Sequence, residues 1–329
     1  ASTWDKELLS EVGRTIAREL RAQGGHIGYG PVIDLAREPR WSRVEETYGE
    51  DTYLTSEMAA ARGRGTGPKH NGWDKGASST LKHFVAYGIP EGGHNGNPSN
   101  VGERDLHENF LPAFKSAIDA GALSVMTSYN SIDGVPSTGN PELLRDLLKE
   151  EWGFDGFVVS DLVSIDGLHS DHHIAKDKED AGIIAINAGV DVDLGANCFA
   201  LLKEAVESGK VSDKVLDEAV GRVLRLKFEL GLFDNPYVDP QAAAAEVRKA
   251  ENIEVAHQAA RKGVVLLENN GILPLRKDMK VAVIGPNADN MYNQLGDYTA
   301  PQPRENIRTV LDGIKAKIGE KNVTYVKGC

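Results

Sequence analysis

The chain has 329 residues, enough for one large domain and part of a second, because single hydrophobic cores stop growing near about 250–300 residues. Hydrophobic residues make up 40% and charged residues 26%, as in a globular protein, and no apolar run approaches the roughly 18 residues of a transmembrane helix. The formal net charge of −12 disfavours nucleic acids and anionic membrane surfaces as partners.

Helix-like and strand-like segments alternate along the first two thirds of the chain. Apolar residues at helical spacing predict helices over residues 8–20, 54–64, 106–120, 141–151, 179–188, 201–208 and 213–230. Short apolar runs predict strands over residues 30–35, 80–84, 123–129, 156–161 and 189–194. This alternation indicates parallel βαβ units and an α/β fold. Because a closed barrel needs eight strands, the pattern predicts either an open sheet or a barrel that lacks its first strands.

A second α/β pattern begins after a Gly- and Pro-containing helix end near residue 233. An alanine-rich helical run over residues 240–262 precedes apolar runs at 264–267 and 280–285. We therefore expect a partial (β/α) barrel over residues 1–233, a linker over 234–250, and the first part of another domain over 251–329.

Polar side chains follow three of the predicted strands. Lys82 and His83 end one strand, Tyr129 and Asn130 another, and Asp161 a third. The carboxyl ends of parallel strands meet at one face of the fold, and active sites form there. Polar residues that merely start loops would explain one or two of these positions, but hardly all of them. The pattern predicts a site at this face.

Four stretches resemble signatures of glycoside hydrolase family 3, in the order and spacing of that family. They cover residues 30–51, 81–84, 157–161 and 263–275. The resemblance implies a TIM-like barrel that lacks its first strands, followed by the start of an α/β sandwich domain, so that the chain is truncated at both ends. It also implies a retaining glycosidase, whose two carboxyl groups lie about 5–5.5 Å apart.

The resemblance assigns roles to individual residues. Asp161 matches the nucleophile, although an Asp after a strand could also cap the next helix. Arg43 matches a sugar-binding arginine, and Lys82 and His83 match residues that hydrogen-bond sugar hydroxyls. Tyr129 matches a tyrosine beside the nucleophile, where its hydroxyl can orient the carboxylate, but a strand tyrosine could equally belong to the core. Leu162 stands where many relatives carry a sugar-stacking tryptophan.

The acid/base group is expected outside this chain, because most of the family places it far along the second domain. A subset of the family uses a histidine instead, which makes His94 an alternative, although its Gly- and Asn-rich surroundings indicate a flexible rim loop. His169, Asp171, His172 and His173 could in principle bind a metal. Because they share one loop and cannot easily converge, we interpret them as a polar loop and expect neither a metal nor a cofactor.

The sequence therefore predicts a retaining exo-β-glycosidase that hydrolyses terminal non-reducing β-linked sugars, first of all a β-D-glucosidase acting through a glycosyl-Asp161 intermediate. Alternatives are a β-xylosidase, a phosphorylase or hexosaminidase using His94, and, from another class, a non-catalytic sugar-binding module. The expected partner is a β-linked oligosaccharide or glycoside, with no nucleic acid and no membrane. A homodimer remains open, and the composition favours a periplasmic or secreted bacterial protein.

Overall fold

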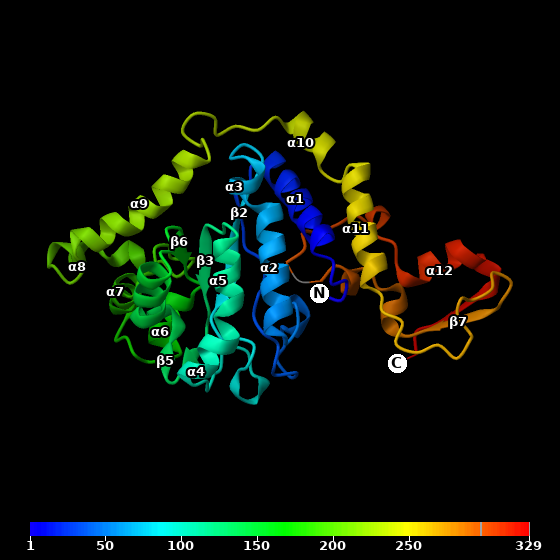
Figure 1. Ribbon diagram of the computed structural model, residues 1–329, viewed down its shortest axis with the longest axis horizontal. Helices are drawn as coiled ribbons and strands as arrows, with labels where there is room; N and C mark the ends of the chain where they lie inside the picture. The colour runs from blue at the N-terminus through cyan, green and yellow to red at the C-terminus, as the bar shows by residue number, and fades with distance from the viewer. Residues whose placement is uncertain (297, 329) are drawn as a thin grey trace. The chain divides into compact units, whose positions relative to one another are not determined.

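The computed structural model describes residues 1–296 and 298–328 and divides the chain into two compact units, Ala1–Val264 and Val265–Cys329 (Figure 1). The predicted linker, residues 234–250, lies within the first unit. Among the described residues, no helix combines the length and the apolar character needed to cross a membrane.

Helices make up most of the first unit. It contains the α-helices α1 (Lys6–Ala22), α2 (Thr52–Thr66), α3 (Pro68–Asn71), α4 (Glu103–Asp105), α5 (Pro112–Asp119), α6 (Ser164–Ser170), α7 (Lys178–Ala188), α8 (Lys203–Glu207), α9 (Asp213–Glu229), α10 (Pro240–Glu246) and α11 (Ala250–Gly263). Two segments of π type, η3 (Leu106–Phe110) and η5 (Glu142–Glu151), complete the helical layer. The predicted helix over 106–120 is therefore formed by η3 and α5 together.

The strands of the first unit form a parallel sheet and a small hairpin. They are β1 (Ile27–Gly28), β2 (Ser78–Phe84), β3 (Ser124–Thr127), β4 (Ser131–Ile132), β5 (Val135–Pro136) and β6 (Phe157–Val159). The parallel sheet has the order β1-β2-β3-β6, while β4 and β5 pair in antiparallel fashion. Leu81 is level with Val125, and Val125 with Val158, so the strands run in step and end at a common edge.

Two predicted strands are shorter than expected. The 30–35 segment joins the sheet only through a bridge between Val32 and Lys82, and the regular strand β1 comes before it. Pro31 has no N–H to donate to a ladder, which limits regular pairing there. The 189–194 segment joins β6 through a single bridge between Val159 and Val192. The parallel α/β architecture is confirmed, with fewer paired strands among the described residues than the eight of a closed barrel.

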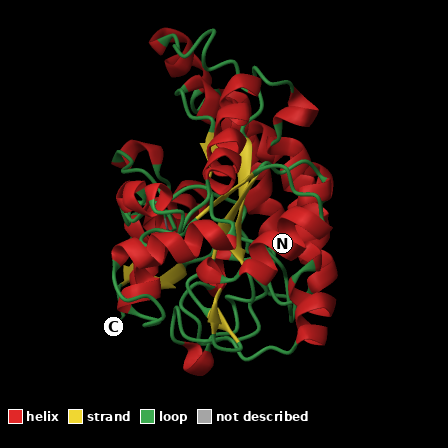
Figure 2. Cartoon of the chain, turned by 90° about the vertical axis from the view of Figure 1, so that its left-hand side faces the viewer, coloured by secondary structure: helices red, strands yellow, loops and turns green. Residues whose placement is uncertain are grey.

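The core lies between the parallel sheet and the helices around it, and Figure 2 shows the strands in yellow among these helices. Leu81, Val125 and Val158 are completely buried on neighbouring strands. The ring of Phe84 packs edge-on against Phe114 of α5 at 5.0 Å between centroids. In Figure 1, α2 and α5 lie beside β2 and β3. This packing anchors β2 and β3, whose carboxyl ends carry the candidate site residues.

The second unit contains a parallel pair of strands, β7 (Val281–Ile284) and β8 (Val323–Val326), and the helix α12 (Val310–Ile318). Thr309 begins α12 with a capping box, in which its hydroxyl accepts the Asp312 N–H and its own N–H donates to the Asp312 carboxylate. The predicted strand over 264–267 is absent from this described part of the chain, where the segment is extended but unpaired.

Candidate active site

Asp161 lies just beyond β6, at the carboxyl end of the parallel sheet, and only 8% of its surface is exposed. The Ser164 N–H donates to the Asp161 carbonyl (3.0 Å), so the chain turns here from the strand into α6. Val163 adopts a φ of 65°, a left-handed conformation that β-branched residues rarely take. Backbone strain of this kind accumulates at functional sites, and here it accompanies the turn that positions the carboxylate.

One oxygen of the Asp161 carboxylate is fixed by two donors. The N–H of Leu162 donates to Oδ1 (2.7 Å), and the Tyr129 hydroxyl lies 3.0 Å from the same oxygen. The tyrosine hydroxyl also lies 2.8 Å from the Leu162 carbonyl oxygen, so its proton is shared between two acceptors. Burial, reinforced by the charge of Asp161, raises the pKa of Tyr129. The phenol therefore stays protonated and serves as a donor to the carboxylate.

His83 connects Asp161 to a second carboxylate, Asp34. The Asp34 Oδ2 atom accepts hydrogen bonds from His83 Nδ1 (2.8 Å) and from the His83 backbone N–H (3.1 Å). On the other side of the ring, His83 Nε2 lies 3.5 Å from Asp161 Oδ2. His83 is completely buried, and the peptide bond between Lys82 and His83 is cis. Asp34, His83 and Asp161, from three separate segments at the carboxyl end of the sheet, thus form one buried chain of contacts.

Two cations lie near this chain of contacts. Burial lowers the pKa of Lys82, as does the like charge of Arg43, while Asp161, Glu46 and Asp34 oppose the shift. The Arg43 guanidinium forms a bidentate ion pair with Glu46 (2.6 and 2.9 Å). Burial alone would raise the pKa of Glu46, but the hydrogen bonds and charge of Arg43 bring it below its ordinary value. The site therefore contains ionised groups of both signs in a largely buried setting.

The structure brings Asp161, His83 and Tyr129 into direct contact and places Lys82 within their electrostatic reach. Asp34 was not singled out from the sequence, although it ends the apolar run Val32-Ile33 much as Asp161 ends its own run. That similarity is a usable signal, because carboxylates directly after buried strands in a parallel fold gather at the same edge.

The other histidines singled out from the sequence lie apart from Asp161. His94 is exposed on the loop after the short helix Glu91–Gly93. His169 lies in the last turn of α6, and His172 and His173 lie in the loop that follows. Their rings donate to the carbonyl oxygens of Ala175, Tyr129 and His169, respectively. The hydrogen bond from His172 to the Tyr129 carbonyl oxygen supports the backbone of Tyr129.

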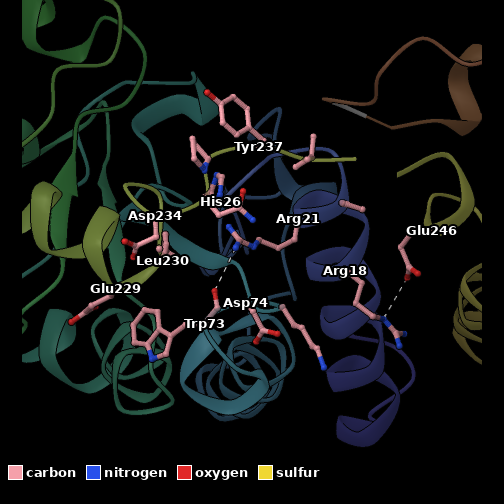
Figure 3. Close-up of a pocket in the computed structure, with 16 residues that line it drawn as sticks. Arg18, Arg21, His26, Trp73, Asp74, Glu229, Leu230, Asp234, Tyr237 and Glu246 are labelled. Atoms are coloured by element: carbon pink, nitrogen blue, oxygen red, sulfur yellow. Dashed lines mark hydrogen bonds and ion pairs between the residues drawn. The ribbon is translucent and has the colours of Figure 1, made fainter. Parts of the chain in front are cut away.

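Two of the cavities in the first unit bear on the position of the site. One of about 520 Å³ lies beside Tyr129. Its lining residues are Asn95, Gly96, Asn97, Pro98, Tyr129, Ser164, Gly167, Asp171 and His172. Another of about 680 Å³ is shown in Figure 3, where Arg21 contacts the Trp73 carbonyl and Arg18 pairs with Glu246. Trp73 precedes β2, so this second cavity lies at the amino end of the strands, opposite Asp161, and is separate from the candidate site.

The geometry defines a class of protein: an α/β protein that holds an oriented, buried carboxylate beside cations at the carboxyl edge of a parallel sheet. Comparison with known proteins supplies the family. The model of the Glycosyl hydrolase family 3 N terminal domain matches residues 1–226, and that of the Glycosyl hydrolase family 3 C-terminal domain matches residues 264–326. The chain belongs to glycoside hydrolase family 3.

The curated relatives in this family are named for two different activities. The chain is 37% identical to a periplasmic beta-glucosidase of Salmonella typhimurium, over 100% of this chain and 44% of that protein. It is 39% identical to a beta-xylosidase of Formosa agariphila, over 100% of this chain and 48% of that protein. The chain thus spans about half the length of the curated relatives it matches.

A solved structure confirms the fold. The beta-glucosidase of Listeria innocua in complex with glucose superposes with a TM-score of 0.93 at 36% identity, covering 99% of this chain and 45% of that one. A mutant of the same enzyme has been solved in complex with laminaribiose.

Proposed function

We propose that this chain carries the nucleophile side of a retaining exo-β-glycosidase, first of all a β-D-glucosidase. The observation that carries the proposal is the Asp161 carboxylate, held by Tyr129 and the Leu162 N–H beside His83 and Lys82. A carboxylate that is held in a fixed orientation beside cations is suited to attack an anomeric carbon. The β-glucosidases among the relatives, one of them bound to glucose, support the choice of sugar.

The proposed reaction has two steps. In the first, Asp161 attacks the anomeric carbon while the bond to the departing oxygen breaks and that oxygen takes a proton from an acid. In the second, water attacks the same carbon, its proton passes to the conjugate base, and the electron pair of the ester bond returns to Asp161. Asp34 and Glu46 are engaged by His83 and Arg43, so neither is available to protonate the departing oxygen, which supports an acid/base group outside residues 1–329.

The remaining residues bind and position the substrate in this proposal. Arg43, Lys82 and His83 would orient the hydroxyl groups of the terminal sugar, and Tyr129 would orient the nucleophile. No step requires a metal or an organic cofactor. The substrate would be a β-linked oligosaccharide or glycoside, and the Listeria innocua beta-glucosidase mutant solved in complex with laminaribiose supports this choice.

We also propose the division into a catalytic domain (1–233), a linker (234–250) and a sandwich domain that begins at 251. The ends of the two family matches, at residues 226 and 264, support this division. A periplasmic or secreted location is proposed from the periplasmic relative, and cell fractionation of the native host would test it.

The test is covalent trapping in the full-length protein. An activated 2-fluoro-glucoside should form a stable adduct that peptide mapping locates on Asp161, and Asp161→Asn should abolish both the adduct and turnover. Asp193→Asn is the matched control, because Asp193 is also an aspartate after a strand segment but accepts three backbone N–H groups of its own turn. An adduct on another residue would overturn the assignment of Asp161.

A second candidate, β-xylosidase activity, is favoured by the Formosa agariphila relative. Comparing kcat/KM for aryl glucosides and aryl xylosides decides between the two sugars. A protein that binds the sugar in calorimetry but forms no adduct and turns over neither substrate would instead be a non-catalytic sugar-binding module.

A further inference from the structure

Asp34 is joined to His83 by two hydrogen bonds that end on one oxygen. The backbone around Asp34 runs alongside β2, where the Ile33 N–H donates to the Lys82 carbonyl (2.8 Å). The Asp34 Oδ2 atom accepts both the backbone N–H and the Nδ1 of His83, and Asp34 is 2% exposed. One carboxylate oxygen therefore fixes the position of the main chain and the orientation of the ring at the same time.

The ring orientation directs Nε2 of His83 towards the Asp161 carboxylate, at 3.5 Å from Oδ2. The ring also packs edge-on against Tyr87, at 4.9 Å between centroids. A neutral imidazole has only one N–H, so it can donate to only one of the two carboxylates that flank it. A doubly protonated ring has a second N–H, on Nε2, to direct at Asp161 Oδ2, and neither of these two buried atoms has a hydrogen-bond partner among the described residues.

The charges around the ring favour the same protonation state. The carboxylates are Asp34 and Asp161 in contact with the ring and Glu46 within electrostatic reach, while the cations are Lys82 and Arg43. The phenols of Tyr87 and Tyr129 complete the surroundings of the ring and the nucleophile. Two buried carboxylates and the partly buried Glu46 face two cations, and buried charges are stable only when they are paired. An imidazolium at His83 supplies the third positive charge.

We propose that Asp34 is a positioning residue that holds His83 as an imidazolium with its Nε2–H directed at the nucleophile Asp161. The inference rests on the proposed function, because it assigns Asp161 the role of nucleophile. The imidazolium affects the two steps of the proposed hydrolysis differently. A cation beside Asp161 stabilises the carboxylate, so it assists the second step, in which the ester bond breaks and its electron pair returns to Asp161.

Because the imidazolium assists the second step, its loss should produce a specific pattern in kcat and KM. With an activated aryl glucoside, removal of the aglycone is fast and the second step limits turnover. We expect Asp34→Asn in the full-length protein to lower kcat by about ten- to a hundredfold, the size of effect seen when a residue that orients a reacting group is replaced. KM should fall together with kcat because the covalent intermediate accumulates, and a pre-steady-state burst should appear. A merely structural loss would not produce this combination.

A second measurement needs no glycosidase activity. Long-range proton–nitrogen spectra of the ¹⁵N-histidine-labelled chain show which ring nitrogens are protonated, and His83→Gln assigns the signal. We expect both nitrogens of His83 to be protonated at neutral pH in the unmodified chain, and one of them to lose its proton in Asp34→Asn. Asp191→Asn is the matched control, because Asp191 is another buried, ion-paired aspartate next to this sheet; it should change neither the spectrum of His83 nor the values of kcat and KM.

The outcomes separate the two proposals. A neutral His83 in the unmodified chain overturns the inference, whatever the activity. Unchanged kcat in Asp34→Asn, with Asp161→Asn inactive, overturns the inference and leaves the proposed function standing. No adduct on Asp161 in the unmodified protein overturns the proposed function, while the spectra still decide the state of His83. If Asp34→Asn does not fold, the spectra of the unmodified chain and of Asp34→Glu, which keeps the charge and should keep both protons, decide the question.

Discussion

Tyr129 places its hydroxyl 3.0 Å from Oδ1 of Asp161, and burial and the neighbouring charge keep it protonated. A hydrogen bond to a charged group contributes about 1.5–3 kcal/mol, so we expect Tyr129→Phe to lower kcat by about 10- to 100-fold with little change in KM. Steady-state kinetics of the full-length protein on an aryl glucoside measure this. Tyr48→Phe, which removes the hydroxyl of another partly buried tyrosine in the same unit, serves as the control. Equal effects of the two changes would contradict the role of Tyr129.

Lys82 gives the site a pH dependence with a definite sign. Burial lowers its pKa, so its positive charge is lost at a lower pH than for an ordinary lysine. We expect kcat/KM to fall as the pH rises through this lowered pKa, and Lys82→Arg to shift the alkaline limb upwards because arginine stays charged. The contribution to stability has the opposite sign: the unfolded state binds the proton more tightly, so the free energy of unfolding rises between the two pKa values.

The pH profile of kcat/KM in the full-length protein tests this, with unfolding measured at matched pH values. An alkaline limb that does not move in Lys82→Arg would assign that limb to another group. Tyr129 is an unsuitable candidate, because its own pKa is raised.

At the scale of elements, a buried ion pair between Lys149 and Asp191 links the helix η5 to the sheet. Lys149 lies 2.7 Å from Asp191, and Asp191 also accepts the Val158 N–H of β6 (2.7 Å). Burial lowers the pKa of Lys149 and raises that of Asp191, because both charges are costly away from water. We expect Lys149→Met to reduce the free energy of unfolding by about 3–5 kcal/mol, since it leaves an unpaired buried carboxylate, and Lys149→Met with Asp191→Asn to recover part of that loss.

Urea unfolding followed by tryptophan fluorescence measures this change in the first unit, because all four tryptophans lie there. Lys203→Met is the control, since its pair with Glu207 is exposed and should contribute at most about 1 kcal/mol. If the double variant is no more stable than Lys149→Met, an unpaired Asp191 is not the cause of the loss.

The helices were predictable from the sequence, whereas several strands were not. Helical periodicity predicted α1 and α9 to within a few residues, because one apolar face repeats over several turns. The expected helix over 240–262 divides into α10 and α11, where Arg248 adopts a φ of 58°. Strand pairing depends on a partner distant in the sequence. The apolar run 264–267 therefore looked like a strand but is unpaired in the described structure.

The candidate site was predictable where a single stretch of sequence carried the signal. Lys82, His83, Tyr129 and Asp161 all end predicted strands, and the structure brings them together. The hydrogen bond between Asp34 and His83 joins residues that are 49 positions apart in the sequence. No local sequence pattern predicts a contact over such a separation. The fold supplies it, because residues 31–34 run alongside β2.

At the scale of the whole molecule, the run 264–267 exposes four consecutive apolar side chains at the start of the second unit. Val264 is 80% and Leu267 is 92% exposed. A short apolar segment with high β propensity and no charge is prone to pair with copies of itself. We expect the 329-residue chain to associate with rising concentration, and Leu267→Lys to reduce this association. Light scattering over a concentration series measures it. Leu201→Lys, at an isolated exposed leucine of the first unit (47%), should change little; an equal effect of both substitutions would show that added charge acts without regard to the segment.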